Sequence, residues 1–374
     1  MDRGNDFSAC KPAPWQHKME KSKTALVIGA TGMAGRALIA DLDRRHDWQV
    51  IAVARKAPDF TTNARFVALD LLDRARCREI LGGLTEVTHV FYMAYVDHPV
   101  IAETRIPNVN MFANAMVGIE SAAGNLQHVC LLQGTKYYGH YLGPFKTPAK
   151  EDDPRVPVPH FYYDQQDLLM RLREGKAWSW SCARPHIIGG FAPGNPLNLI
   201  ATIAVYATLR REMGMPLTFP GKPGAFTSIC QATDAGILAR AMIFMATTQS
   251  AADHAFNVTN GDFFRYQNVW PTFAEYFGMQ AGGVATVDLV KTMAGEAARW
   301  DAIVTKYGLA RHELSRLVNW NFADYVFSID WDVMSDTIKC RQHGFSECID
   351  STKMFLAQFD VLRKNQIIPP FVAT

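Results

Sequence analysis

Three glycines near the start of the chain are spaced three residues apart. Gly29, Gly32 and Gly35 form a GxxGxxG pattern that follows the short apolar run 24–28 and opens a helical pattern over 36–44. Glycine lets a backbone turn sharply and approach a pyrophosphate, while the helix N-terminus supplies amide donors and a favourable dipole. The strand–turn–helix context therefore predicts a dinucleotide-binding turn.

The residues after the second apolar run, 48–54, decide which dinucleotide would fit. An NAD enzyme carries Asp or Glu there, because a carboxylate can hold the ribose 2′-hydroxyl. This chain has Arg55 and Lys56 instead. Guanidinium and ammonium groups pair with a 2′-phosphate, which a carboxylate would repel. The sequence therefore predicts NADP(H), although Lys56 could also serve solubility alone.

A residue that could assist chemistry at this cofactor is harder to identify. Many reductases on such a fold carry Tyr-x-x-x-Lys on one helix, where the lysine lowers the tyrosine pKa. None of the twelve tyrosines is followed by lysine four positions later. Lys136 comes just after the apolar run 128–132, and Tyr162 and Tyr163 open a helical pattern. By spacing alone, Lys136 fits a catalytic lysine and a surface lysine equally well.

Alternating apolar and amphipathic segments must position these residues. The expected strands are residues 24–28, 48–54, 66–69, 87–93, 128–132 and 178–183, and helical spacing covers 73–81, 110–123 and 161–172. This alternation predicts an α/β fold with a doubly wound parallel sheet of the Rossmann type. The GxxGxxG spacing further indicates a short-chain dehydrogenase of the extended type, which has a smaller, mostly helical C-terminal substrate-binding region.

The alternation loosens after about residue 184. Helices are expected over 197–213 and 269–277, a strand over 256–258, and a mostly helical tail over 284–374. We predict a flexible leader (1–23), an NADP(H)-binding Rossmann domain (24–190) and a substrate-binding region (191–374) whose segment 229–262 returns to the Rossmann sheet. Four tryptophans in the last third fit either core packing or an aromatic-lined pocket for an apolar ligand: Trp270, Trp300, Trp320 and Trp331.

Composition excludes several classes of protein. Of the 374 residues, 48% are hydrophobic, which is too many for a disordered chain. The 38 basic and 36 acidic residues give a net charge of only +2 without a basic run, so neither nucleic acid nor a membrane surface is expected as a partner. The longest apolar stretch, 197–209, is too short to span a bilayer. The seven cysteines are scattered without a CxxC pair, which predicts reduced thiols, a cytoplasmic location and no metal site.

Longer stretches carry a more specific pattern. They read GTKYY (134–138), LGPF (142–145), ED (151–152), FYY (161–163), RP (184–185), GFAP (190–193), FNVTNGD (256–262) and AEYFG (274–278). In these stretches the chain resembles the progesterone 5β-reductase/iridoid synthase family of enone reductases. The resemblance covers nearly everything from Thr24 to the C-terminus, and the combination of Thr-Lys after one strand with Phe-Tyr-Tyr before a helix is quite specific.

The resemblance implies NADPH-dependent 1,4-reduction of the C=C bond of α,β-unsaturated carbonyl compounds, which are enones or enals and could include steroid enones. Hydride would reach the β-carbon, Tyr162 would hydrogen-bond the oxygen that becomes an enolate, and Lys136 would replace the missing helix lysine. The implied substrate contacts are Tyr95, Phe145, Tyr162 and Phe191, and their character indicates a small neutral carbonyl substrate. A homodimer is also plausible for this fold class.

The cofactor contacts follow from the glycine pattern and the resemblance together. Gly29, Thr31, Gly32, Met33 and Gly35 fall at the pyrophosphate turn, Arg55 and Lys56 at the 2′-phosphate, Asp70 and Leu71 by the adenine, and Ala94, Tyr95, Leu132, Ile188, Asn195, Pro196 and Leu197 along the rest of the cofactor.

Several departures from the family keep the substrate open. Plant members typically have Thr-Trp at Ala94-Tyr95 and Gln at Leu132, and this chain has extra residues at 139–141. Two alternatives use the same fold: an NADP(H)-dependent carbonyl reductase or sugar-nucleotide epimerase, and a non-catalytic NADP(H)-sensing protein. The absent Tyr-x-x-x-Lys argues against the first, and the presence of both Lys136 and Tyr162 argues against the second.

Overall fold

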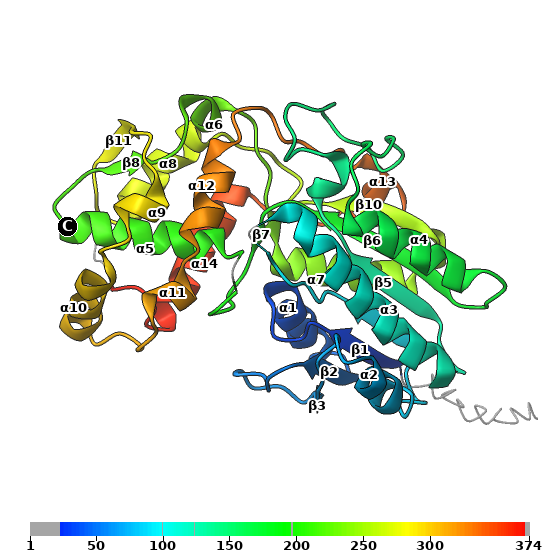
Figure 1. Cartoon of the computed structure of the whole chain (residues 1–374). Coiled ribbons are helices and arrows are strands. Elements are labelled where there is room, and N and C mark those ends of the chain that lie inside the picture. Colours follow the sequence, from blue (N-terminus) through cyan, green and yellow to red (C-terminus); the bar gives the residue numbers. More distant parts are fainter. Residues whose placement is uncertain (1–22, 99, 123, 196, 371–374) are drawn as a thin grey trace, which may run out of the picture.

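The centre of the molecule is a seven-stranded sheet in which every pair of neighbours is parallel (Figure 1). The computed structural model describes residues 23–98, 100–122, 124–195 and 197–370. The strand order is β10-β6-β5-β4-β1-β2-β3. The strands are β1 (Lys23–Ile28), β2 (Trp48–Ala54), β3 (Arg65–Ala68), β4 (His89–Tyr92), β5 (His128–Leu132), β6 (Ser179–Pro185) and β10 (His254–Val258). The predicted doubly wound Rossmann sheet is confirmed.

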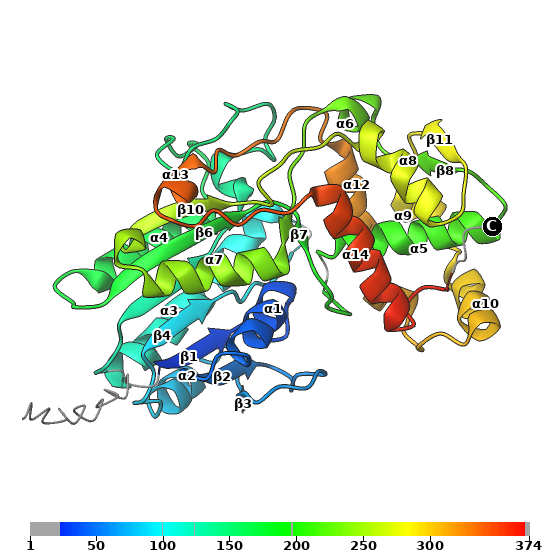
Figure 2. The same cartoon turned by 180° about the vertical axis from the view of Figure 1, so that it is seen from behind.

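Helices cover both faces of this sheet (Figures 1 and 2). Successive side chains of β1 alternate between faces, so Ala25 and Val27 join one core while Leu26 and Ile28 join the other. The first core includes α1 (Met33–Leu42) and α7 (Ala235–Thr247), which pack against each other. The second includes α2 (Arg74–Leu81), α3 (Arg105–Ala122) and α4 (Phe161–Arg173). Two-sided burial explains why the strands are apolar nearly throughout.

A third core lies in the mostly helical part, which gathers at one end of the sheet (Figure 1). Its elements are β7 (Ile188–Gly189), α5 (Leu199–Glu212), β8 (Leu217–Phe219), α6 (Pro223–Thr227), β9 (Thr233–Asp234), α8 (Tyr266–Tyr276), β11 (Ala281–Val284), α9 (Leu289–Thr292), α10 (Ala297–Tyr307), α11 (Leu314–Leu317), α12 (Trp320–Ser328) and α14 (Ser351–Lys364). Helix α13 (Ile338–Gln342) lies apart from them and packs against β10 of the sheet. Trp270 and Trp300 are fully buried there, so packing explains those two.

The observed elements differ from the predicted ones in instructive places. Helix α7 packs on the sheet beside α1 and is apolar and buried along most of its length, which weakens the amphipathic pattern, so it went unpredicted. Helix α8 begins at Tyr266, three residues earlier than expected, and continues through Pro271. Strand β10 pairs with β6, so the chain does return to the sheet after the helical part begins. The domain boundary at 190 stays a prediction.

Candidate active site

The glycine turn adopts a backbone that only glycine fits well. Gly29 follows β1 with φ +91°, and a Cβ added there would lie 2.8 Å from the backbone nitrogen of Ala94. Gly32 is the N-cap residue of α1 and has no side chain that could accept from the backbone amides of the first helical turn. A Cβ at Gly35 would collide with the carbonyl oxygen of Gly29. The turn therefore brings three backbone segments close together and offers free amides to an anion.

A large cavity opens beside this turn. Its volume is about 990 Å³, and it runs along the carboxyl ends of β1, β4 and β5, where the order of strands reverses direction. The described residues of the predicted cofactor set all line it: Gly29, Thr31, Gly32, Met33, Gly35, Arg55, Lys56, Asp70, Leu71, Ala94, Tyr95, Leu132, Ile188, Asn195 and Leu197. Pro196 lies outside the described residues. The structure thus brings together residues up to 168 positions apart, and their contacts with a cofactor stay predictions.

A third cation joins the two predicted at one end of this cavity. Arg55 and Lys56 are exposed and line it. Arg36, the residue after the last glycine, lines it as well, and its Nε donates to the carbonyl oxygen of Thr31 over 3.3 Å. The sequence contained a signal for Arg36 in its position after Gly35, which our interpretation missed.

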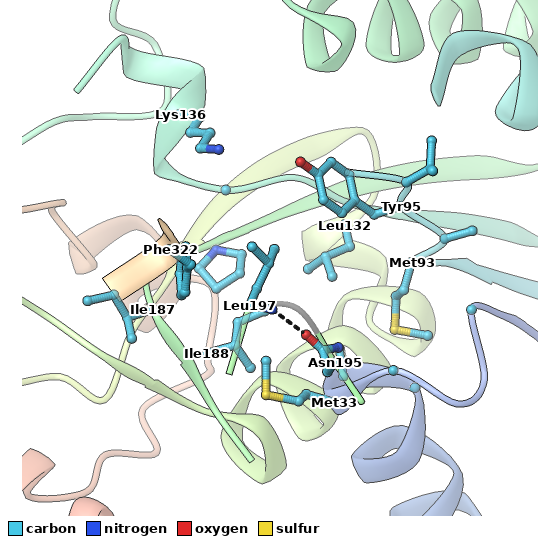
Figure 3. Close-up of a pocket in the computed structure, with 18 of the residues that line it drawn as sticks. Met33, Met93, Tyr95, Leu132, Lys136, Ile187, Ile188, Asn195, Leu197 and Phe322 are labelled. Atoms are coloured by element: carbon cyan, nitrogen blue, oxygen red, sulfur yellow. Dashed lines mark hydrogen bonds between the residues drawn. The ribbon is translucent and has the colours of Figure 1, made fainter. Parts of the chain in front are cut away.

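Lys136 and Tyr162 also line the cavity, although they come from different elements. Lys136 lies in the short turn η2 (Thr135–Tyr138) after β5, and Tyr162 lies in the first turn of α4. A Cβ at Gly134 would lie 3.2 Å from the Tyr162 hydroxyl, so this hydroxyl rests against the segment that carries Lys136. Figure 3 shows Lys136, on its short helical turn, and Tyr95 pointing toward the same space. The lysine thus comes from the end of β5 instead of from the tyrosine's own helix.

Local contacts hold Tyr162 at the start of α4. Its backbone N–H donates to Nδ1 of His160 over 3.2 Å, and its carbonyl accepts from the Gln133 side chain over 3.0 Å. Tyr163 points elsewhere: its buried hydroxyl donates to the carbonyl oxygen of Tyr137 over 2.6 Å. Only Tyr162 of the pair lines the cavity.

Burial sets the charge of these groups. Desolvation raises the pKa of Tyr162, so its hydroxyl stays protonated, and lowers the pKa of Lys136, which Asp97 partly offsets. Burial also lowers the pKa of His140 and of His160 to about 4, so both imidazoles are neutral at pH 7. This part of the cavity therefore offers a phenol donor beside an ammonium group, which suits stabilisation of a developing oxyanion.

The far wall of the cavity comes from the C-terminal region. Tyr325 on α12 lies with its hydroxyl 3.2 Å from Nε2 of His140, and its ring centroid is 5.5 Å from Nζ of Lys136. The wall also contains Arg316, Phe322, Val326, Ile329, Trp331 and Val333. Of these residues, the sequence analysis named only Trp331, as one of four tryptophans. The sequence pattern of residues 314–333 does not indicate which strand ends these side chains face.

Two predicted substrate contacts lie apart from the cavity lining, so their contact with substrate stays a prediction. Phe145 and Phe191 do not line the cavity. Phe145 packs against the small cluster of Tyr137, Tyr138, Ala149 and Tyr163, while Phe191 packs against the helical core. Each of the two side chains is partly buried against its cluster. Tyr95, in contrast, lines the cavity, stacks on Phe161 at 5.7 Å and donates its hydroxyl to Asp97 over 2.7 Å.

The described part of the chain contains neither a cluster of metal ligands nor a membrane-spanning helix. Across residues 23–98, 100–122, 124–195 and 197–370, no three His, Cys, Asp or Glu side chains gather as metal ligands would. Within the same ranges, none of the helices has both the length and the apolar character that crossing a bilayer requires.

Comparison with solved structures supports the fold alone. UDP-glucose 4-epimerase from Thermotoga maritima, solved with UDP-glucose, aligns with a TM-score of 0.66 at 14% identity over 91% of this chain and 99% of its own. A short-chain dehydrogenase/reductase superfamily protein from Agrobacterium tumefaciens with bound NAD aligns with a TM-score of 0.65 at 13% identity, covering 92% and 98%. These neighbours confirm the extended short-chain dehydrogenase architecture.

Comparison of sequences is more specific. The chain is 33% identical to a 3-oxo-Delta(4,5)-steroid 5-beta-reductase from Arabidopsis thaliana over 92% of its own length and 93% of the relative's. It is 32% identical to an (S)-8-oxocitronellyl enol synthase from Camptotheca acuminata with the same coverage, and 31% identical to a short chain dehydrogenase from Penicillium aethiopicum over 93% and 99%. Residues 25–369 match the model of the PRISE-like Rossmann-fold domain, so this chain, with its glycine turn, its lysine after β5 and its tyrosine opening α4, belongs to that family.

Proposed function

We propose that the protein catalyses the NADPH-dependent 1,4-reduction of the C=C bond of α,β-unsaturated carbonyl compounds. The observation that carries this proposal is the meeting of Lys136 and Tyr162 in the cavity that begins at the glycine turn. The names of the relatives agree with it, since a 3-oxo-Δ4,5-steroid is an enone and a 5β-reductase adds hydrogen to its double bond. The protein is accordingly an oxidoreductase of the short-chain dehydrogenase/reductase superfamily.

The residues present fit an NADP(H) molecule. The cradle at Gly29 admits no Cβ, and the amides of the first turn of α1 are uncapped by a side chain, which suits a pyrophosphate. Arg55 and Lys56 line the cavity end that follows β2, where cations suit a 2′-phosphate. The volume of about 990 Å³ lies at the upper end of the range for ligand pockets, about 300–1,000 Å³. NADP(H) is therefore proposed over NAD.

The side chains have complementary roles in the chemistry. When bound, NADPH supplies the hydride that the β-carbon accepts. Tyr162 donates its hydroxyl hydrogen to the carbonyl oxygen, where negative charge develops as the enolate forms. Lys136 adds a positive charge beside that donor, and its half-buried position makes the interaction stronger than it would be in water. The neutral imidazoles of His140 and His160 neither compete for negative charge nor add a second cation there.

The wall opposite the strand ends favours a neutral substrate. Most of its side chains are apolar or aromatic, among them Phe322, Val326, Trp331 and Val333, and Tyr95, Phe161 and Ile187 add apolar lining elsewhere in the cavity. A charged substrate group would lose its hydration among these apolar side chains. We therefore infer that small neutral enones or enals are preferred. A homodimer stays a prediction, which light scattering on the purified protein would check.

The assay that tests this proposal follows NADPH oxidation with an enone, with a saturated ketone and without substrate. A small cyclic enone should be reduced to the saturated ketone, whereas a saturated ketone should give no NADPH oxidation above the rate without substrate. Product identity is read by gas chromatography with mass spectrometry. An alcohol as the product would contradict the proposal, and so would tight NADPH binding without turnover of any enone or enal.

A further inference from the structure

Arg36 is unusually well oriented for a residue beside a cofactor cavity. It occupies the first turn of α1, directly after the last glycine of the turn. Only 12% of its side chain is exposed, although its guanidinium lines the cavity together with Arg55 and Lys56. Its Nε donates to the carbonyl oxygen of Thr31, and its Cζ lies 4.6 Å from the ring centroid of Phe60. The side chain is thus held by a backbone contact on one side and an aromatic face on the other.

The remaining contact of Arg36 is with a carboxylate. Its Nη2 forms an ion pair with Oδ1 of Asp59, which also lines the cavity. The two partners differ sharply in exposure, because 61% of the Asp59 side chain is accessible to solvent. Asp59 can therefore turn into water, where its carboxylate would be hydrated, while Arg36 stays in the cavity wall. The buried partner, in contrast, has lost part of its hydration and gains from any anion that reaches it.

The charges at this end of the cavity therefore comprise three cations and two acids. Arg36, Arg55 and Lys56 stand against Asp59 and Asp70. Asp70 accepts a hydrogen bond from the backbone of Leu72 and belongs to the loop after β3. Asp59 is already paired with Arg36, so it is not free to hold a ribose hydroxyl as the acid of an NAD enzyme does. Contact of the adenosine ribose with Arg36 would favour NADPH, whereas contact with Asp59 would favour NADH.

We infer that Arg36 is the selectivity-determining residue of the 2′-phosphate site and that Asp59 competes with the phosphate for its guanidinium. This inference rests on the proposed preference for NADPH. A planar guanidinium binds phosphate with two parallel N–H donors, and the contacts to Thr31 and Phe60 orient that plane in advance. Arg55 and Lys56 are exposed and have no such support.

Binding measurements on four proteins test the inference. Dissociation constants for NADPH and NADH are measured by quenching of tryptophan fluorescence for wild type, Arg36→Gln, Asp59→Asn and Arg44→Gln. Arg44 is the matched control, because it is also paired with an aspartate near α1, Asp41, and does not line the cavity. Thermal unfolding midpoints show whether each variant is folded.

Arg36→Gln should weaken NADPH binding about tenfold or more and change NADH binding by less than about threefold. Asp59→Asn should strengthen NADPH binding and leave NADH unchanged, and Arg44→Gln should alter neither. Adenosine 2′,5′-bisphosphate, used as a competitor, should lose affinity for Arg36→Gln in the same proportion as NADPH.

Three results would overturn the inference. One is an Arg36→Gln protein that keeps the wild-type ratio of NADPH to NADH affinity. Another is an Asp59→Asn protein that binds NADH more weakly, which would make Asp59 the partner of a ribose hydroxyl. The third is equal weakening of both cofactors by Arg36→Gln, which would place Arg36 at the shared pyrophosphate. A wild type without preference for NADPH would instead refute the proposed cofactor, so the two failures are distinguishable. If Arg36→Gln does not fold, Asp59→Asn and Arg36→Lys carry the test.

Discussion

Adjacent residues in this protein have unrelated tasks. Tyr162 and Tyr163 are neighbours in the first turn of α4, yet one faces the cavity and the other donates to the backbone of η2. A helix turns by about 100° per residue, so neighbouring side chains cannot share a direction. Tyr163 thereby holds the turn that carries Lys136, while Tyr162 lines the cavity, where the proposed function has it meet the substrate oxygen.

Removing the Tyr162 hydroxyl should therefore reduce the rate without harming the fold. Tyr162→Phe leaves no cavity, and loss of an oxyanion donor lowers a rate constant by about 10²–10³. We expect kcat for an enone to fall by that factor while the dissociation constant of NADPH stays nearly unchanged. Single-turnover and binding measurements on the same preparation check this.

Tyr163→Phe is the matched comparison. It loses the 2.6 Å hydrogen bond to the carbonyl of Tyr137, so we expect a loss of stability of about 1 kcal/mol and a rate within a few-fold of wild type. Urea unfolding and enone turnover are measured together. The assignment is wrong if Tyr163→Phe is the inactive variant and Tyr162→Phe is active on every enone tested.

The lowered pKa of Lys136 should make the reaction rate depend on pH in a lower range than an exposed lysine would. Burial lowers the pKa of the Lys136 ammonium below 10.5, and burial raises the pKa of Tyr162 above 10. The ammonium is present below its pKa, so kcat/KM should be level near neutral pH and fall as pH rises through the lowered lysine pKa. Lys136→Arg should move this decline to higher pH, because guanidinium stays charged. A decline at the same pH in Lys136→Arg would assign it to another group.

At the scale of elements, the turn between β1 and α1 lies so close to the end of β4 that no side chain fits between the two backbones. Gly29 allows the carboxyl end of β1 to pass beside Ala94 at the end of β4, and this contact closes the base of the cavity. The strand pairing fixes the approach, since β1 and β4 are hydrogen-bonded in register up to Ile28 and Tyr92. The turn therefore cannot move away to admit a methyl group without disturbing the sheet.

Gly29→Ala should damage both stability and cofactor binding. The φ of +91° is unfavourable for alanine, and its Cβ would lie 2.8 Å from backbone atoms of Met93 and Ala94. We expect a loss of about 2 kcal/mol or more in the free energy of unfolding, with weaker binding of NADPH and NADH alike. Gly283→Ala in β11 is the control, because no heavy atom lies within 4 Å of its added Cβ. Equal urea midpoints for the two variants would refute the argument.

At the scale of the whole molecule, one buried arginine connects the segments around the site. Arg184 on β6 is 1% exposed and donates to the side chains of Gln133, Tyr138 and Gln166 and to the carbonyl of Glu151. Its Cζ lies 3.4 Å from the ring centroid of Tyr137. These partners come from the end of β5, from η2, from α4 and from the loop before α4, so one guanidinium supports the elements that carry both Lys136 and Tyr162.

Arg184→Met should therefore lower the free energy of unfolding more than an arginine-to-methionine substitution at the surface. The substitution removes four hydrogen bonds, three of them buried, for an expected cost of about 3–5 kcal/mol. Arg76→Met removes an exposed arginine whose partner Glu79 is also exposed, and should cost less than about 1 kcal/mol. Chemical denaturation gives both values. Similar values for the two variants would show that the Arg184 network does not hold these segments.

The sequence by itself determined the features that depend on local periodicity. Apolar runs and the helical spacing between them predicted the strands of the sheet, because a strand buried on both faces must be apolar along its length. The glycine spacing predicted the turn, because only glycine fits the backbone at Gly29. Lys136 and Tyr162 could be named from the sequence because both stand beside recognisable elements, one after a strand and one at a helix start.

The tertiary structure alone decided which side chains complete the cavity. Tyr325 meets His140 across 185 positions of sequence, and no local pattern encodes a contact of that range. For the same reason the sequence could not show that Phe145 and Phe191 pack against two apolar clusters and are not among the residues that line the cavity. An aromatic side chain is equally suited to a core and to a pocket, and its neighbours in space determine which of the two it joins.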